Sequence, residues 1–367
     1  MNSKIQNFKE YALSSETGEI KQWGLSSGST LLNLAATNNP DYCFVAGKYH
    51  FMVGDSSSGK TALSLTSLAE ASINPAFDNY RLIYDDVEGG NLFAIEKLFG
   101  KKLVDRLEPP AKDKDGPVYS STTEEFYYNV DNAIKEGIPF IYILDSETGL
   151  SSDAEKEKFE ETKQAHYKGK TTTGSYGDGK AKKNSSNLRR LMAPLRDSES
   201  ILIVLSQTRS NISPMSFDTK TRSGGHALRF YASLEMWSSK KGKIKKTIKG
   251  KDRQLGIMSK VDIKKNRFTG REPTIEIPIY YSFGIDDVGS CIQYLIDEGV
   301  WVKKGAKVSA PVFGFDFKEG EAPFTFEKLA QYIDEDDDRI TQLKEVVAET
   351  WRDIDKRCQL NRKSRYE

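Results

Sequence analysis

Short apolar runs alternate with helical or loop-like stretches through the first two thirds of the chain. The clearest runs cover residues 48–53, 81–84, 140–144 and 201–205, and a segment with helical spacing, 60–68, follows the first of them almost directly. Strands that alternate with crossover helices form parallel sheets. The pattern therefore predicts an α/β fold with a mainly parallel central sheet and flanking helices.

The pattern changes beyond Ala232. Strand-like segments over 233–237 and 256–264 are joined by a basic connection, and a third segment covers 274–280. Proline cannot donate a hydrogen bond to a β-ladder, so Pro278 favours a position at the sheet edge for this last strand.

Two amphipathic helices are predicted near the end of the chain, one around 292–296 and one over 340–354. They suggest a small C-terminal α/β domain. We therefore expect three parts, an N-terminal segment over 1–40, an α/β core over 41–284 and a C-terminal domain over 285–367.

Composition narrows the class of protein only slightly. The 54 basic residues nearly cancel the 53 acidic ones, so the formal net charge is +1 and any nucleic-acid surface must come from local clustering. The three cysteines and three histidines have neither disulfide nor zinc-ligand spacing. No apolar run is long enough to cross a bilayer, and the first residues lack a secretory signal, so a reducing cytoplasm is expected.

The segment that joins the first strand to its helix matches the phosphate-binding pattern G-x-x-x-x-G-K-[ST]. Its residues are Gly54, Asp55, Ser56, Ser57, Ser58, Gly59, Lys60 and Thr61. Glycines allow backbone N–H groups to wrap phosphates, the lysine reaches the β- and γ-oxygens, and the threonine hydroxyl binds Mg²⁺. The alternative is a chance glycine–serine turn. The flanking strand and helix favour an ATP site.

Two further acidic positions suit phosphate chemistry. Asp145 directly follows five apolar residues, which places it at the carboxyl edge of the sheet, where it could hold Mg²⁺ together with Thr61 or could merely cap the next turn. Glu88 follows the second strand and is our candidate for the base that orients water. Asp86 competes with it, and both could be solvated loop carboxylates.

Two polar segments are candidates for DNA contacts. The first, between Asp145 and Ile201, is expected to be a flexible loop that is disordered without DNA, and its candidate residues are Lys168, Lys170, Lys180, Lys182 and Lys183. Its composition fits a mobile solvated insertion equally well. The second runs from Arg209 to Gly225. Its candidates are Arg209, Met215, Phe217, Lys220 and Arg222, although Met215 and Phe217 could instead pack against the sheet.

Two charged clusters have a simpler interpretation. The basic segment 240–253 is expected to form a solvated hairpin, with a secondary DNA surface as the alternative. The acidic run 334–338 precedes the final helix, where acids favourably meet the positive end of the helix dipole. Control of DNA access is the weaker interpretation of that run.

From about Ser26 to Asp286 the chain resembles the RecA family of recombinases. Similar segments occur in the family's order: Ser27-Gly28-Ser29, Gly54 to Thr61, Asp86-Val87-Glu88, Leu144-Asp145-Ser146, Ser206 to Arg209, Ser223 to Ser233 and Lys265-Asn266-Arg267. Gly284-Ile285-Asp286, with a helical unit after it, is most similar to the UvsX-type recombinases of tailed phages. Leu92 and Ile95 depart from the family's adenine-contacting residues, and Arg267 stands where the family has lysine.

The resemblance implies roles for particular residues. Glu88 would activate water, Gln207 would sense the γ-phosphate and couple it to the second DNA loop, and Lys265 and Arg267 would reach the neighbouring subunit's ATP. It also favours DNA contacts for the segment after Asp145. The N-terminal segment, with Ile5, Phe8 and Tyr11, would be a polymerisation arm.

The function implied is that of a DNA-dependent ATPase that uses ATP and Mg²⁺. It would form a helical filament on single-stranded DNA and exchange strands with a homologous duplex in recombination and repair, in the cytoplasm of a phage-infected bacterium. Single-strand-binding and loading proteins would be further partners. A hexameric replicative helicase and a nucleotide-regulated mediator remain alternatives, although the helicase offers no reason for the segment Ser223 to Ser233.

Overall fold

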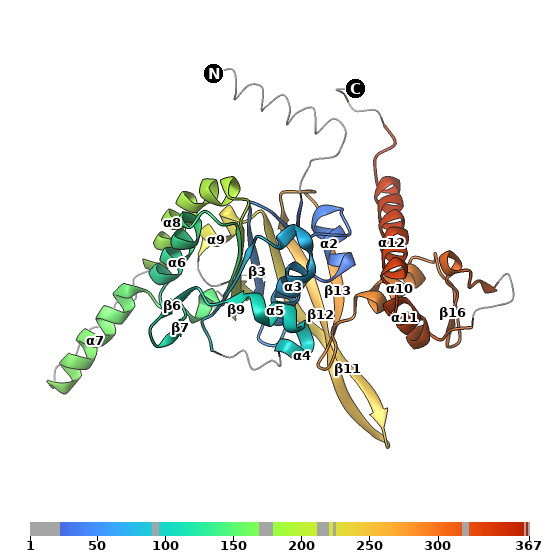
Figure 1. The fold of residues 1–367 in the computed structure, drawn as a ribbon, viewed down its shortest axis with the longest axis horizontal. Helices are drawn as coiled ribbons and strands as arrows, with labels where there is room; N and C mark the ends of the chain where they lie inside the picture. The colour runs from blue at the N-terminus through green and yellow to red at the C-terminus, as the bar shows by residue number, and fades with distance from the viewer. Residues whose placement is uncertain are drawn as a thin grey trace.

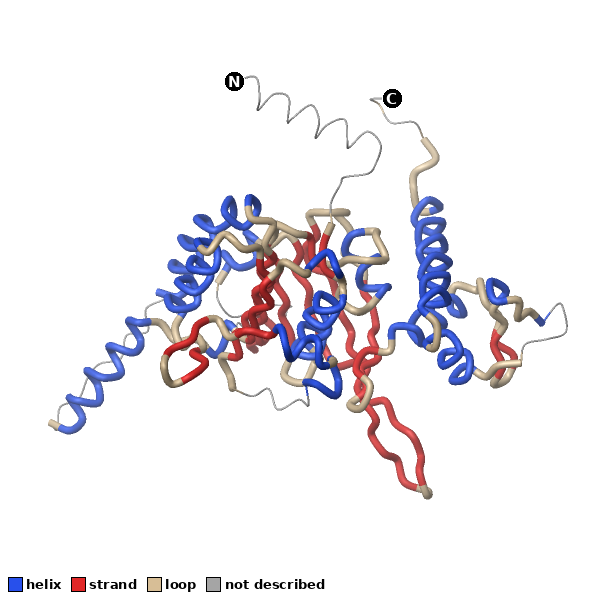
Figure 2. The backbone as a smooth tube through the Cα atoms, viewed as in Figure 1, coloured by secondary structure: helices blue, strands red, loops and turns tan. Residues whose placement is uncertain are grey.

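A computed structural model describes residues 23–89, 95–168, 179–210, 220–222, 225–317, 323–362 and 365. In this part of the chain ten strands form one twisted sheet with helices on both faces (Figures 1 and 2). The predicted α/β fold is therefore confirmed. No helix in these ranges is both long and apolar enough to span a membrane.

The sheet has a parallel half and an antiparallel half. β3 pairs in parallel with β9 and β11, β8 with β9 and β4, and β4 with β5. Beyond β11 the strands β12, β13 and β14 are antiparallel, and β10 adds to β9. The strands are β3 (Tyr49–Gly54), β4 (Arg81–Asp86), β5 (Leu107–Glu108), β8 (Phe140–Asp145), β9 (Ile201–Ser210), β10 (Lys220–Arg222), β11 (Leu234–Ile248), β12 (Lys251–Asn266), β13 (Thr274–Tyr280) and β14 (Gly284–Ile285).

Alternate residues of the central strands pack into two apolar clusters, one on each face. Ile141, Ile143 and Ile203 face the cluster that holds α2 and α3, whereas Tyr142 and Val204 face the cluster beneath α6, α8 and α9. A strand buried on both faces is apolar along its whole length, which is why these strands appear in the sequence as continuous runs. These helices are α2 (Thr30–Thr37), α3 (Lys60–Ile73), α6 (Thr123–Lys135), α8 (Gly179–Asp197) and α9 (His226–Tyr231).

Shorter elements complete the core. They are β1 (Gly24–Leu25) with β2 (Phe44–Val45), β6 (Ala111–Asp113) with β7 (Gly116–Val118), the helices α4 (Ile95–Phe99), α5 (Lys101–Arg106) and α7 (Asp153–Tyr167), and the 3₁₀ turns η1 (Pro75–Phe77) and η2 (Glu147–Gly149).

The C-terminal helices pack onto the same apolar cluster as α2 and α3. They are α10 (Asp287–Asp297), α11 (Phe326–Asp334) and α12 (Asp337–Arg357), with η3 (Pro311–Phe313) and a small ribbon of β15 (Lys303–Lys304) and β16 (Lys307–Val308). Asp336 caps α12, accepting from the N–H groups of Asp338 and Arg339, so the acidic run has the structural role expected for it. The domain division at 284/285 stays a prediction.

The segment after Asp145 is largely helical in its described part, so its prediction as a flexible loop was wrong there. Ser152 and Glu155 form a capping box that starts α7, because each side chain satisfies a free N–H group of the other's backbone. Leu188, Leu191 and Leu195 recur at helical spacing and bury one side of α8 against the sheet. The many lysines and glycines of the segment masked this periodicity.

The basic segment 240–253 forms the hairpin that was expected, with strands longer than predicted. β11 and β12 run together well beyond the body of the sheet (Figure 1). Lys249 and Gly250 at its tip have φ values of 51° and 73°, which a two-residue hairpin turn of the primed type requires. Pro278 lies on β13, and among the described residues only the two-residue β14 pairs outside it, at Ile279 and Tyr280. The prediction that this proline lies on an edge strand is therefore nearly correct.

Candidate active site

Strand register brings the predicted nucleotide residues to one edge of the sheet. Gly54 at the end of β3 is paired with Gln207 on one side and Ser238 on the other. On the next pair of strands Asp86 is opposite Asp145. Ligands of open α/β sheets bind outside the carboxyl ends of parallel strands, so this edge is the expected place for a site.

The phosphate-binding loop curls around the ammonium group of Lys60. Lys60 begins α3, and its Nζ donates to the carbonyl oxygens of Gly54 and Asp55, both at 2.8 Å. Burial lowers the pKa of Lys60, while the nearby carboxylates of Asp145 and Glu88 act in the opposite direction. A buried cation at a helix N-terminus makes this loop a strong anion site.

The loop is held from behind by the two strands of the hairpin. Ser58 and Ser238 share a hydrogen bond between their hydroxyls at 2.7 Å, and Ser259 Oγ donates to the carbonyl oxygen of Ser58, also at 2.7 Å. A Cβ at Gly54 would lie 2.1 Å from Ser238 Oγ and 2.5 Å from the Ser238 carbonyl oxygen. Glycine is therefore required at this position by close packing as well as by the motif.

Asp145 and Thr61 meet as predicted for a Mg²⁺ site. Thr61 Oγ1 donates to Asp145 Oδ2 at 2.7 Å, and Tyr84 OH donates to the same oxygen at 2.9 Å. Burial raises the pKa of Asp145, and the hydrogen bonds from Thr61 and Tyr84 oppose that rise. A hydroxyl and a carboxylate are hard oxygen ligands of the kind Mg²⁺ uses beside phosphate groups.

Glu88 is connected directly to Gln207. Glu88 Oε1 accepts from Gln207 Nε2 at 3.0 Å and from Ser146 Oγ at 2.6 Å. The backbone of Gln207 is fixed in turn, because its N–H group donates to Thr148 Oγ1 at 2.8 Å. Asp86 also borders the cavity described next, so both candidate acids remain at the site. The contact with Gln207 favours Glu88.

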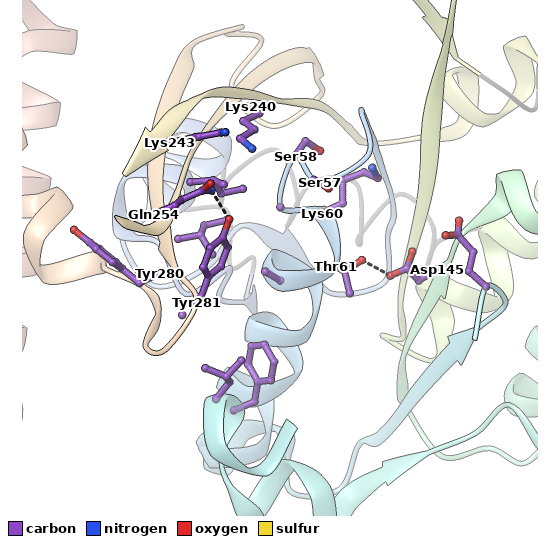
Figure 3. A pocket seen from close by; sticks show the side chains of 18 of the residues that line it. Ser57, Ser58, Lys60, Thr61, Asp145, Lys240, Lys243, Gln254, Tyr280 and Tyr281 are labelled. Atoms are coloured by element: carbon purple, nitrogen blue, oxygen red, sulfur yellow. Dashed lines mark hydrogen bonds between the residues drawn. The ribbon is translucent and has the colours of Figure 1, made fainter. Parts of the chain in front are cut away.

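A cavity of about 470 Å³ lies against the loop (Figure 3). The phosphate-binding loop, Glu88 and Asp145 form one side of it. The other side comes from the antiparallel half of the sheet, with Lys240, Lys243, Gln254, Tyr280 and Tyr281. The loop, the paired oxygen ligands and the tyrosines together fit a magnesium nucleotide, with phosphates at Lys60 and apolar surface available for a base.

Sequence reasoning missed this second wall. Its residues follow no motif, and they meet the loop only because β11 pairs with β3 and β12 and β13 pair in turn. The two adjacent tyrosines after an apolar strand were the one available signal. In Figure 3, Lys240 and Lys243 lie across the cavity from the loop.

Lys265 and Arg267 lie at the opposite edge of the sheet from the loop. Leu234 is paired both with His50, near the start of β3, and with Asn266, whereas the loop begins after the last residue of β3. Lys265 Nζ donates to the carbonyl oxygens of Arg229 and Phe230 at 2.6 and 2.8 Å. Arg267 Nη2 donates to the second of these at 2.8 Å. Burial and the neighbouring Arg267 lower the pKa of Lys265 to about 8.

The predicted DNA residues of the first segment divide into two groups. Lys180 and Lys183 form ion pairs with Glu147 and Glu124, respectively, on the body of the protein. Lys168 and Lys182 are exposed. Lys170 lies outside the described residues.

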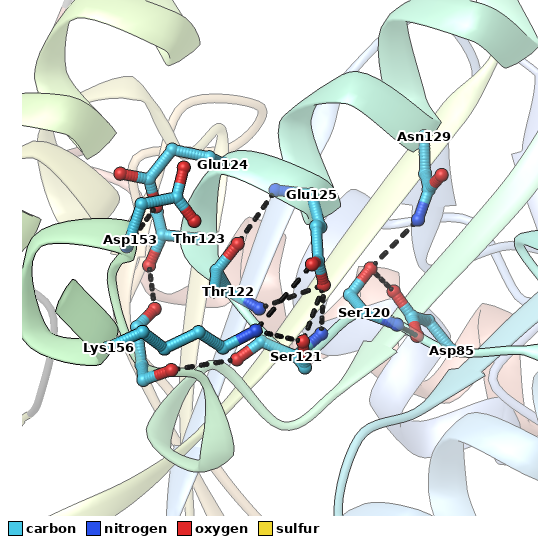
Figure 4. Close-up of polar contacts among 11 residues, drawn as sticks. Asp85, Ser120, Ser121, Thr122, Thr123, Glu124, Glu125, Asn129, Asp153 and Lys156 are labelled. Carbon is cyan, nitrogen blue, oxygen red and sulfur yellow. Dashed lines mark hydrogen bonds and ion pairs between the residues drawn. The ribbon is translucent and has the colours of Figure 1, made fainter. Parts of the chain in front are cut away.

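Figure 4 shows the polar contacts around Glu124, the ion-pair partner of Lys183. Glu124 Oε2 accepts from the backbone N–H of Asp153 at 3.3 Å, which ties the start of α6 to the start of α7. Beside it the side chain of Lys156 donates to Ser121 Oγ at 2.7 Å. The N-terminal turns of α6, α7 and α8 therefore form one polar cluster.

In the second DNA segment the structure describes few of the predicted residues. Arg209 is exposed near the end of β9, and Lys220 and Arg222 lie on β10, which pairs back onto β9. Met215 and Phe217 lie outside the described residues.

Comparison with known proteins identifies similar chains. The family model described as the RecA N-terminal domain matches residues 161–286. "Protein RecA" of Thermus aquaticus is 27% identical over 308 residues, which cover 83% of this chain and 79% of that protein. "Protein RecA" of Brucella suis is 27% identical over 264 residues, which cover 71% of this chain and 64% of that protein, so the match spans less than two thirds of the Brucella protein.

Proposed function

We propose, on the premise that this chain has a RecA-type P-loop fold and is related to the RecA proteins, that it is an ATP-dependent DNA recombinase. It assembles into a helical filament on single-stranded DNA, pairs that strand with a homologous duplex and exchanges the strands. We place it with the phage-type recombinases, which act in the cytoplasm of an infected bacterium. The support for this finer placement is the Gly284-Ile285-Asp286 segment and the helical unit that follows it.

One observation carries the proposal: the residues expected to act on a single nucleotide lie at opposite edges of one sheet. The loop and Glu88 line the cavity at the carboxyl edge of the parallel strands, while Lys265 and Arg267 lie at the opposite edge. A chain that carries one half of a phosphate site at each edge of its sheet can complete the site only by contact with a second copy of the same chain. Such head-to-tail contacts give open helical polymers when the rotation does not close.

At the cavity, the chain's own residues divide the work of ATP hydrolysis. Lys60 and the N–H groups of the loop bind the phosphates, and Thr61 and Asp145 would hold Mg²⁺, which neutralises charge on the β- and γ-oxygens. Glu88 takes a proton from the attacking water. Because Gln207 donates to the same carboxylate, any movement of β9 changes the position of this base.

Gln207 also connects the cavity to the proposed DNA surface. Arg209 follows two residues later on the same strand, and β10 with Lys220 and Arg222 pairs beside it. DNA bound along this segment would therefore act on Gln207 through one rigid strand. The proposed first DNA segment includes Lys168, Lys170 and Lys182, of which Lys168 and Lys182 are exposed in the structure. Lys180 and Lys183 stabilise this segment through their ion pairs with Glu147 and Glu124.

The test is strand exchange itself. Wild-type protein should transfer a labelled strand from a homologous duplex to a single strand in the presence of ATP and Mg²⁺, with DNA-stimulated hydrolysis. Lys60→Ala should lose both activities, because the buried phosphate charge loses its cation. Closed rings under the microscope instead of open filaments would identify a helicase. DNA binding without nucleotide turnover would identify a mediator.

A further inference from the structure

The wall of the cavity that faces the phosphate-binding loop carries two lysines to which the hydrolysis described above gives no role. Lys240 and Lys243 lie on β11, and both line the cavity. Figure 3 shows their side chains across the cavity from the loop. Of the described residues that line the cavity, Lys60 is the only other cation.

A β-bulge brings these two lysines to the same face of β11. Side chains alternate between the faces of a regular strand, so residues three apart would point to opposite sides. The pairing of β11 with β12 shifts by one residue between Lys240 and Gly242. Lys241 is the extra residue, and its insertion returns Lys243 to the face of Lys240. Bulges are frequent beside active sites, where they redirect a side chain.

The extra residue of the bulge has a partner, whereas the two lysines of the cavity have none of that kind. Lys241 does not line the cavity and forms an ion pair with Glu276 on β13. Among the residues that the structure describes, neither Lys240 nor Lys243 forms an ion pair. Two cations that face the same space repel each other, so an anion between them and the loop would stabilise the arrangement.

Strand register places Lys240 beside the phosphate-binding loop. Ser259, directly opposite Lys240, donates through Oγ to the carbonyl oxygen of Ser58 at 2.7 Å. Ser238, two residues before Lys240 on the same face, shares a hydrogen bond with the Ser58 hydroxyl at 2.7 Å. Lys243 follows on that face, further from the loop. The two lysines therefore begin at the loop and continue along the cavity wall.

The phosphate chain of a nucleotide is the anion that fits this position. Lys60 and the N-terminus of α3 already make the loop side an anion site, while the carboxylates Glu88 and Asp145 lie on that side as well. A lysine only donates, and it binds phosphate as a point charge. The base and the sugar of a nucleotide carry no charge, so its phosphates are the part that two lysines can bind most strongly.

We propose that Lys240 and Lys243 bind the phosphate chain of the nucleotide from the wall opposite Lys60. The inference rests on the proposed function in taking ATP, and ADP after hydrolysis, as the occupant of the cavity. Both lysines belong to the same subunit as the loop, whereas Lys265 and Arg267 would come from a neighbour. A single subunit therefore holds the phosphates between two walls before it assembles.

The experiment measures binding of ADP and of adenosine to the full-length protein by calorimetry, with Mg²⁺ and without DNA, over a range of salt concentrations. The test variant carries Lys240→Gln and Lys243→Gln. Its matched control carries Lys241→Gln and Lys245→Gln, which removes the same charge from the same strand at two exposed lysines outside the cavity lining. A third variant, with Lys240→Arg and Lys243→Arg, keeps the charge. Thermal unfolding verifies that all three variants fold.

ADP should bind the test variant about tenfold more weakly or worse, because even one lost hydrogen bond between charged groups costs about that factor. Its affinity for ADP should also depend less on salt. Adenosine should bind as it does to the wild type, and the control and the arginine variant should keep most of their affinity for ADP. Wild-type ADP binding by the test variant would overturn the proposal. So would an equal loss of ADP in the control, or an equal loss of ADP and adenosine in the test variant.

Two parallel measurements distinguish this inference from its alternatives. Binding of labelled DNA without nucleotide should be the same in the test variant and the control, and a selective loss of DNA binding with ADP binding intact would show that the lysines serve DNA instead. Strand exchange by the wild type tests the proposed function separately. If the wild type exchanges no strands but binds ADP through these lysines, the recombinase assignment fails while the phosphate contact stands.

Discussion

Glu88 is the acid whose surroundings best suit a catalytic base. Its carboxylate is exposed to the cavity, where water can reach it, and two donors, Ser146 and Gln207, fix its Oε1 atom. The remaining oxygen can accept a proton without breaking either contact. Asp85, on strand β4, is buried and bonded to Ser120 and Tyr142, which gives it a structural role.

Glu88→Gln should retain nucleotide binding and lose most hydrolysis. The amide preserves shape but cannot take a proton, and a general base contributes about 10²–10⁴-fold to rate. DNA-stimulated ATP turnover and binding of a fluorescent nucleotide would be measured on the same preparation. Asp86→Asn is the control, since Asp86 borders the same cavity. If Asp86→Asn alone removed turnover, Asp86 would be the base.

The lowered pKa of Lys265 predicts a dependence of assembly on pH. Burial and the nearby Arg267 bring this pKa to about 8, so the free subunit loses the positive charge of Lys265 as the pH rises through that value. A subunit that must present this charge to a neighbour's ATP then has to take up a proton. The protein concentration needed for half-maximal DNA-stimulated hydrolysis should therefore rise above pH 8. In Lys265→Arg this rise should be absent, because arginine remains charged. An identical pH profile in both proteins would contradict the role.

The nucleotide loop could be predicted from sequence because it is contiguous, and its chemistry requires glycine, lysine and threonine at fixed spacing. Asp145 was predictable because a strand delivers its last residue to the sheet edge. Tyr84 and Ser238 were not, since their contacts with Asp145 and Ser58 depend on which strands are neighbours. Strand order is set by packing across the whole sheet, and no local pattern carries it.

Among the larger elements, the parallel strands were predictable and the helices after Asp145 were not. The strands are buried on both faces, which leaves an apolar run in the sequence. Helix α8 buries only one side, and its first turns are rich in lysine. The structure shows that two of those lysines are anchored to carboxylates, so charge alone could not separate DNA-facing residues from structural ones.

Lys180 and Lys182 should therefore respond differently to the same substitution. The side chain of Glu147 is 2% exposed, and Lys180 lies 3.3 Å from its Oε1 atom. Lys180→Met leaves that buried carboxylate without its cation and should lower the free energy of unfolding by about 1–3 kcal/mol. Lys182→Met should change it by less than about 0.5 kcal/mol, because Lys182 is exposed.

Urea denaturation would measure both stabilities, and anisotropy of a labelled oligonucleotide would measure binding of single-stranded DNA. We expect Lys182→Met to weaken DNA binding without loss of stability. A Lys180→Met variant of wild-type stability that binds DNA poorly would instead show that Lys180 contacts DNA directly.

The two halves of the proposed phosphate site lie at opposite edges of the sheet, so the two ends of the molecule are different and can meet head to tail. The cavity lies at the carboxyl edge, and Lys265 and Arg267 project from the other, where carbonyl oxygens at the end of α9 hold them. A cation supplied across an interface makes hydrolysis conditional on assembly, and such cations contribute about 10³–10⁵-fold to rate in other phosphoryl-transfer systems. Isolated subunits should accordingly bind ATP but hydrolyse it very slowly.

Mixing two inactive variants tests this arrangement. Lys60→Ala lacks the loop cation, and the double variant Lys265→Ala, Arg267→Ala lacks the pair at the other edge, so each should be inactive alone. In a mixed filament, the intact loop of a double-variant subunit can meet the intact cations of a Lys60→Ala neighbour. That interface is complete, and part of the DNA-stimulated hydrolysis should return. A mixture of Lys60→Ala with Glu88→Gln is the matched control, because both changes damage the same edge and no contact can restore a whole site. If microscopy shows mixed filaments while the first mixture stays as inactive as the control, the two edges do not act on one nucleotide.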